Sequence, residues 1–218
     1  MANPNRVFNY KVQRRIVGAI ALLLGPVTSW LAGRSLPSIS DSYWTDANSV
    51  FVGALCVVAA FLAGYSGQGE SRDREYWLAK VTGVLALLVA LFPTSGPADV
   101  CGESASQVSC VPPEWTSQIA SWFGVAPTNI HYFAAVLLFA GLTYMMWIFS
   151  SRARTKGYPA RANFYAGFCI MMLMGLLAGL ASWLMQLGQK DLVYWIELWI
   201  LSWFGIGWLL AGWYTDHN

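Results

Sequence analysis

The chain has 218 residues, of which 56% are hydrophobic and only 11% are charged, and its formal net charge is +2. Soluble domains carry about 25% charged residues, so this composition excludes a soluble monomer, and so small a net charge argues against nucleic acid binding. The length is that of one domain, which we assign to residues 1–218.

Six segments are apolar over the length at which a helix crosses a bilayer, which is about 20 residues with a range of roughly 17–25. The third is the shortest and contains Lys80, which lies near enough to the helix end for its ammonium group to reach the lipid headgroups. The predicted fold class is therefore an all-α integral membrane protein with six transmembrane helices. The predicted spans cover approximately residues 16–32, 49–67, 77–92, 130–150, 163–185 and 192–213.

The basic residues are distributed asymmetrically between the two predicted sides of the membrane. Only Arg34 and Lys190 fall on one side. By the positive-inside rule the other side is cytoplasmic, and both termini lie there. We therefore expect a multi-pass protein of the plasma (inner) membrane. Of the thirteen basic residues, the eleven on the cytoplasmic side are Arg6, Lys11, Arg14, Arg15, Arg72, Arg74, Lys80, Arg152, Arg154, Lys156 and Arg161.

The longest predicted external connection, residues 93–129, contains two cysteines. Cys101 and Cys110 are nine positions apart, and an external loop faces an oxidising compartment, so we expect a disulfide between them. The loop has neither a CxxC motif nor a histidine beside them, and no metal site is expected.

The same connection predicts a short helix that opens with Pro113. Trp115, Ile119, Trp122 and Phe123 follow at helical spacing and give this helix an aromatic face. Such a helix lies on the membrane surface or packs as a lid on the external ends of the spans, and the two interpretations are compatible.

Ionisable residues inside a membrane are costly and tend to be functional, and few are present here. Glu197 is the only acid clearly within an apolar span, and His131 opens the fourth span from the same, external side. The polar and aromatic segment 36–46 is also external, so these groups share one membrane depth. We therefore predict a polar pocket at the outer-leaflet interface. Its candidate ligand-binding residues are Ser40, Asp41, Tyr43, Asp46, His131, Tyr194 and Glu197.

Three functions are open for this pocket. The first is binding of a membrane lipid or of a partner, either another integral membrane protein or a second copy of the chain, in lipid remodelling or as an accessory subunit. The second is a membrane-embedded lipid hydrolase or acyl-remodelling enzyme. In that enzyme Ser38 or Ser40 would be the nucleophile or oxyanion donor, His131 the general base and Glu197 its orienting acid. The third is a small proton-coupled carrier in which Glu197 titrates.

Two further considerations bear on these functions. A carrier requires polar residues that continue to the cytoplasmic side, and the inner halves of the predicted spans are nearly all apolar. The same polar groups could also serve only as a buried hydrogen-bond network that fixes helix packing, with Glu197 paired to His131 or to a hydroxyl. For Asp41 and Asp46 taken singly, simple solvation is the favoured interpretation.

The sequence predicts no cofactor. It has two histidines in all, which is too few for a three-histidine zinc site, and they cannot form an axial haem pair within the membrane. The last predicted span has no lysine to attach retinal, and neither a P-loop nor a dinucleotide-binding fingerprint is present.

The run Leu36-Pro37-Ser38-Ile39-Ser40-Asp41, followed by Phe51, resembles the LPxISD signature of the FRAG/DRAM/SFK-type membrane proteins, a group that includes GPI-anchor lipid-remodelling factors. His131 is similar to the family histidine, and Glu197-Leu198-Trp199 resembles the Glu-Trp of its last helix. The resemblance spans residues 34–216 and implies six helices in the same order and a role connected with lipids. It supplies no catalytic residues.

Overall fold

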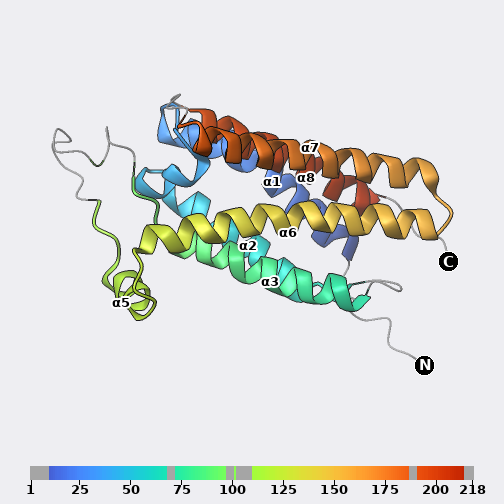
Figure 1. Cartoon of the computed structure of the whole chain (residues 1–218), viewed down its shortest axis with the longest axis horizontal. Coiled ribbons are helices and arrows are strands. Elements are labelled where there is room, and N and C mark those ends of the chain that lie inside the picture. Colours follow the sequence, from blue (N-terminus) through green and yellow to red (C-terminus); the bar gives the residue numbers. More distant parts are fainter. Residues whose placement is uncertain (1–9, 68–71, 97–100, 102–109, 187–190, 214–218) are drawn as a thin grey trace.

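A computed structural model describes residues 10–67, 72–96, 101, 110–186 and 191–213. The secondary structure of these residues is helical and includes no strand, which confirms the all-α prediction (Figure 1). The elements are α1 (Tyr10–Ala32), the 3₁₀ helix η1 (Ile39–Trp44), α2 (Asn48–Gly64), α3 (Arg72–Leu91), α5 (Glu114–Trp122), α6 (Pro127–Thr155), α7 (Pro159–Leu184) and α8 (Leu192–Trp213).

Each predicted span falls on one of the longer helices, but the helices differ in how well they match a bilayer. Among the described residues, α1, α6, α7 and α8 are long and apolar enough to cross a membrane. Helix α2 is apolar but has only 17 residues. Helix α3 has 20 residues and begins with the charged run Arg72-Asp73-Arg74-Glu75, which leaves a shorter apolar stretch behind it. The chain is therefore a helical protein with four clear candidate spans.

The helices pack in chain order and return to their starting point (Figure 1). Helix α1 contacts α2, α2 contacts α3, α3 contacts α6, α6 contacts α7, α7 contacts α8, and α8 packs along α1. The short turn between α6 and α7 favours their antiparallel packing, because a short loop can only return the chain alongside the helix that precedes it.

The contact between α1 and α8 depends on glycines. A Cβ on Gly18 would lie 2.8 Å from the carbonyl oxygen of Gly205, and a Cβ on Gly205 would lie 2.8 Å from that of Gly18. Near the start of α1, a Cβ on Gly212 would lie 2.9 Å from the carbonyl oxygen of Lys11. The two backbones thus approach more closely than any larger residue allows, as in small-residue interfaces of membrane helices. This packing fixes the rotation of α8 relative to the segment that follows α1.

That segment turns back over the end of the helices through η1. Leu36 and Ile39 are buried in the core, and Ser38 caps η1 by accepting a hydrogen bond at Oγ from the Ser40 backbone N–H at 3.0 Å. The N–H of Tyr194 donates to the carbonyl oxygen of Pro37 at 3.0 Å, so the start of α8 is tied to the same segment.

The molecule has two ends of different composition. The end formed by η1, the end of α3 and the starts of α6 and α8 is called the pocket end here. The opposite end, formed by the start of α1, the α6–α7 turn and the end of α8, is called the basic end (Figure 1). Helix α6 begins with Pro127 at the pocket end and carries Arg152 and Arg154 in its last turn, where cations oppose the negative end of the helix dipole.

Candidate functional site

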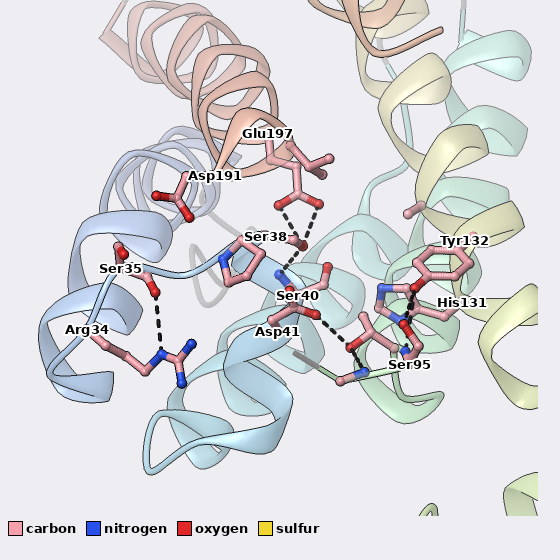
Figure 2. Close-up of a pocket in the computed structure, with 15 residues that line it drawn as sticks. Arg34, Ser35, Ser38, Ser40, Asp41, Ser95, His131, Tyr132, Asp191 and Glu197 are labelled. Atoms are coloured by element: carbon pink, nitrogen blue, oxygen red, sulfur yellow. Dashed lines mark hydrogen bonds between the residues drawn. The ribbon is translucent and has the colours of Figure 1, made fainter. Parts of the chain in front are cut away.

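A cavity of about 630 Å³ lies at the pocket end (Figure 2). This volume is within the range of sites that enclose small molecules and headgroup-sized ligands. The lining comes from four parts of the chain that are far apart in sequence: the segment from α1 into η1, the segment after α3, the start of α6 and the start of α8. The lining residues are Arg34, Ser35, Pro37, Ser38, Ser40, Asp41, Thr94, Ser95, Gly96, His131, Tyr132, Ala135, Asp191, Val193 and Glu197.

The carboxylate of Glu197 joins α8 to the start of η1. Its Oε2 accepts a hydrogen bond from the Ile39 backbone N–H at 2.6 Å. The Ser38 hydroxyl also donates to this carboxylate, and its oxygen lies 3.2 Å from Oε1 and 3.1 Å from Oε2. Figure 2 shows the side chain pointing from α8 toward Ser38. These hydrogen bonds join α8 to the start of η1.

A second carboxylate, Asp41, joins η1 to the segment after α3. The Thr94 hydroxyl donates to Asp41 Oδ1 at 2.9 Å. The indole N–H of Trp44 points at the same threonine, 3.1 Å from its carbonyl oxygen and 3.2 Å from its Oγ1. The position of Asp41 is therefore fixed by neighbours on two elements.

His131 is buried, with 1% of its surface exposed, and lies in the first turns of α6. Its Nδ1 lies 2.7 Å from the carbonyl oxygen of Phe92, which can only accept, so Nδ1 carries the proton of that hydrogen bond. The adjacent Tyr132 pairs its hydroxyl with the Ser95 hydroxyl at 3.0 Å. These two contacts tie α6 to the end of α3 and orient both rings at the cavity.

The charged groups of the lining are unequal in number. Asp41, Asp191 and Glu197 contribute three carboxylates, whereas Arg34 contributes one guanidinium. Asp191 adopts a left-handed backbone conformation with φ of 68°, and no hydrogen bond of its side chain is found among the described residues. Among the described lining residues, the cavity therefore combines three carboxylates with one guanidinium.

The structure brings together most of the residues that the sequence singled out. Ser38, Ser40, Asp41, His131 and Glu197 all line the one cavity. Three other candidate ligand-binding residues do not line it, and their positions are described next.

Tyr43 is partly buried beside Trp44, and burial raises the pKa of its hydroxyl, which keeps that group neutral. Asp46 is exposed to solvent. The side chain of Tyr194 packs in the core, where 9% of the residue is exposed. For Asp46 the solvation interpretation is therefore the better one.

Several lining residues were not singled out as candidates. Thr94 and Ser95 follow the third predicted span, and Tyr132 follows the candidate His131 directly. Arg34 and Asp191 could have been identified as candidates from the sequence, because each charged residue lies at the external boundary of a predicted span. Their convergence depends on the return of α8 to α1, which the sequence does not reveal.

The arrangement differs from the one that the hydrolase hypothesis requires. Among the described residues, no hydrogen bond joins His131 to Ser38, Ser40 or Glu197. The histidine is oriented by the Phe92 carbonyl, and the carboxylate is engaged by Ser38 and Ile39. No cluster of three or more histidine, cysteine or acidic side chains with metal-binding geometry occurs in the described part of the chain.

The expected disulfide is confirmed, and it lies beside the cavity. Cys101 is bonded to Cys110, with 5.3 Å between their Cα atoms. A Cβ on the lining residue Gly96 would lie 2.4 Å from Cys101 Sγ, so the bonded cysteine packs directly against the cavity wall. The residues between the two cysteines lie outside the described part of the chain.

Comparisons with known proteins identify no relative: no family model matches the chain, and neither a curated protein nor a solved structure shows significant similarity to it. The resemblance to the FRAG/DRAM/SFK-type proteins therefore stays a prediction, carried by the residues quoted for it.

Proposed function

We propose that this chain is a six-span protein of the inner (plasma) membrane, with both termini in the cytoplasm, and that its cavity at the pocket end binds the headgroup of a membrane lipid in the outer leaflet. The four candidate spans support insertion in a membrane. So does the outward face of α7, which exposes Leu173, Leu177, Leu180 and Trp183. A water-soluble protein rarely leaves so large an apolar surface uncovered.

On this proposal α2 and α3 also cross the bilayer, although each is a weaker candidate. Helix α2 is short, and α3 places Lys80 inside its first half. The Lys80 ammonium donates to the carbonyl oxygens of Ala63 and Tyr65 at the end of α2. Its charge thus reaches the helix end, which is how a lysine is accommodated near a membrane boundary.

The single observation that supports lipid headgroup binding best is the charge composition of the cavity. A ligand that suits three carboxylates and one guanidinium carries a cationic group and an anionic group. The headgroup of phosphatidylethanolamine has both: its ammonium group matches Asp41, Asp191 and Glu197, and its phosphate matches Arg34. We therefore propose a zwitterionic, ammonium-bearing phospholipid as the ligand class.

Helix α5 supports a membrane surface at this end of the molecule. Trp115 packs its ring against Phe92, with ring centroids 5.7 Å apart. Trp122 and Phe123 are 79% and 71% exposed. One part of the aromatic face thus covers the helix ends, while another part is free to enter the headgroup region, as expected of an interfacial helix.

Neither alternative function gains comparable support. The hydrolase lacks a hydrogen bond from His131 to a candidate serine in the described structure. A proton-coupled carrier needs polar groups between the two ends. The core there is apolar, and the buried Thr82 and Thr143 donate to carbonyl oxygens of their own helices, Leu78 and Phe139.

The test is lipid binding by the purified full chain in neutral detergent, followed by native mass spectrometry. Phosphatidylethanolamine, whose headgroup carries an ammonium group, is the probe lipid, and its binding is compared between wild type and variants. Asp191→Asn is the informative variant, because asparagine has the same shape and tolerates the left-handed backbone. Losing one charge-assisted hydrogen bond, worth about 1.5–3 kcal/mol, is expected to weaken phosphatidylethanolamine binding at least about tenfold.

The matched control is Asp46→Asn, which removes an exposed acid at the same end but outside the cavity. It is expected to change binding less than about twofold, in line with the small effect of an exposed charge. Wild-type phosphatidylethanolamine binding by Asp191→Asn would contradict the proposal.

A further inference from the structure

The basic end holds a second, smaller cavity of about 30 Å³ between α1, α6, α7 and α8. Four basic side chains line it, Arg14 from α1, Arg152 and Lys156 from the end of α6, and Arg161 from the start of α7. None of its described lining residues is acidic. The predicted topology explains why basic residues lie at this end, but it does not explain why four of them converge on one cavity.

Arg14 is the innermost of the four, with 6% of its surface exposed. Its guanidinium lies over the rings of Phe149 and Tyr65, 5.2 and 5.6 Å from their centroids. Nη1 donates to the Ala211 carbonyl oxygen at 3.1 Å, and Nη2 donates to the Tyr65 hydroxyl at 2.9 Å. Its Nε is buried and has no hydrogen-bond partner among the described residues. The guanidinium is therefore held rigidly, and its buried Nε–H group lacks an acceptor among the described residues.

One carboxylate balances part of this charge. Glu75 is fully buried, forms an ion pair with Arg152, and accepts a hydrogen bond from the Tyr65 hydroxyl at 2.7 Å. Among the described residues, four basic side chains and this one carboxylate therefore lie at or beside the cavity. Concentrated positive charge next to a low-dielectric core favours a bound anion.

We propose that this cluster binds a phosphoryl group, supplied by the headgroup of an anionic phospholipid or by free phosphate. A cavity of this size has room for one phosphate oxygen, about the volume of one water molecule. Arg14 and Arg152 hold that oxygen inside the cavity, and the exposed Lys156 and half-buried Arg161 contact the remaining oxygens at the surface. Basic pockets between membrane helices bind anionic headgroups in this way.

The site lies at the opposite end from the zwitterionic-lipid cavity, shares no residue with it, and stands or falls separately. On the predicted topology it faces the cytoplasmic leaflet, where anionic lipids concentrate.

The experiment uses the full chain in neutral detergent and measures half-saturating concentrations by native mass spectrometry. The probes are phosphatidylglycerol and inorganic phosphate. The main variant is the double substitution Lys156→Gln with Arg161→Gln, which leaves the buried Arg14 and Arg152 in place. Each removed charge is expected to raise the half-saturating phosphatidylglycerol concentration about fivefold, and the double variant roughly 25-fold, since a basic residue near an anionic lipid contributes about 1 kcal/mol.

The matched control is Arg154→Gln, on the same last turn of α6 but exposed and outside the cavity. Binding of phosphatidylglycerol alone identifies a lipid as the source of the phosphoryl group, and parallel binding of inorganic phosphate identifies the free anion. Either result supports the site if the double variant weakens the binding and the Arg154→Gln control does not. The single variant Lys156→Gln, at an exposed position, supplies the same comparison should the double variant fold poorly.

Three results would overturn the proposal: binding of neither phosphatidylglycerol nor inorganic phosphate, wild-type binding by the double variant, or equal weakening by Arg154→Gln. The last would mean that the positive surface acts only as a whole.

Discussion

At each end of the molecule a carboxylate joins neighbouring helices, but the hydrogen-bond donors around the two carboxylates differ. At the pocket end Glu197 accepts hydrogen bonds from neutral donors, among them the Ser38 hydroxyl and the Ile39 N–H. At the basic end Glu75 is paired with the cation of Arg152 and with the Tyr65 hydroxyl. Among the described residues, three carboxylates and one guanidinium line the cavity at the pocket end, whereas four basic side chains line the cavity at the basic end.

The difference shows that similar contacts between helices can occur beside cavities whose lining residues carry opposite charges. Within the described residues the pocket end offers a large cavity with mixed charge, and the basic end a small one with cations only. The proposed ligands differ accordingly, a zwitterionic headgroup at one end and a phosphoryl group at the other.

The largest stability effect is expected from Glu75→Gln at the basic end. The substitution removes the only carboxylate from a buried ion pair and leaves Arg152, 13% exposed at its side chain, without its counter-charge. Breaking a buried pair in this way costs about 3–5 kcal/mol. The midpoint of thermal unfolding in detergent should fall well below that of wild type.

The control for this variant is Asp73→Asn, at an exposed position on the same helix. Its unfolding midpoint should stay close to the wild-type value. A similar midpoint for both variants would mean that the Glu75–Arg152 pair contributes nothing particular to stability.

The disulfide is expected to have the next largest effect, confined to the pocket end. It closes a loop of about ten residues, for which chain-entropy arithmetic gives roughly 2–3 kcal/mol. Replacing both Cys101 and Cys110 by serine should lower the unfolding midpoint, and adding reductant to wild type should lower it to the same extent. Cys56→Ala, at an unbonded cysteine, should leave the response to reductant unchanged.

Glu197→Leu should destabilise the pocket end by about 1–3 kcal/mol, because the Ile39 N–H and the Ser38 hydroxyl lose their acceptor. Glu197→Gln keeps the shape and an acceptor oxygen, so it should fold with a smaller loss while weakening binding of a cationic headgroup. Thermal unfolding and lipid binding, measured on both variants, separate the two roles. Equal unfolding midpoints for leucine and glutamine would contradict the contact with η1.

These contacts mark what the sequence could predict and what it could not. The apolar lengths located all six long helices, and the depths of Glu197 and His131 predicted that both would lie at one end. The partners of Glu197 were not predictable, because they depend on the rotation of α8 about its axis. That rotation follows from the backbone contact of Gly18 with Gly205, which joins two helices at opposite ends of the chain.

The basic end illustrates the same limit. Its positive charge was visible in the sequence, and so was the predicted side of the membrane. The ion pair of Glu75 with Arg152 and the stacking of Arg14 on Phe149 required three separate helices to be placed relative to one another. Charge asymmetry therefore predicted where the cations lie but not that they enclose a cavity.

The smallest stability effect is expected from Asp191→Asn, within about 0.5 kcal/mol of wild type, as for other partly exposed positions without a structural contact. This variant combines wild-type unfolding with weaker lipid binding, in contrast to Glu197→Leu, which changes both. A large loss of stability would show that Asp191 holds the pocket end together and is not kept for a ligand.

The central claim is that the two ends lie on opposite sides of a membrane. Its most direct test is to label single cysteines in intact cells with a membrane-impermeant maleimide. The chain would carry Asp46→Cys at the pocket end or Arg154→Cys at the basic end, with Cys56 and Cys169 replaced by alanine. We expect the cysteine at position 46 to be labelled from outside, and the one at position 154 only after the membrane is permeabilised. Labelling of both from the same side, or of position 154 alone from outside, would contradict the orientation on which both proposed lipid sites have been assigned to their leaflets.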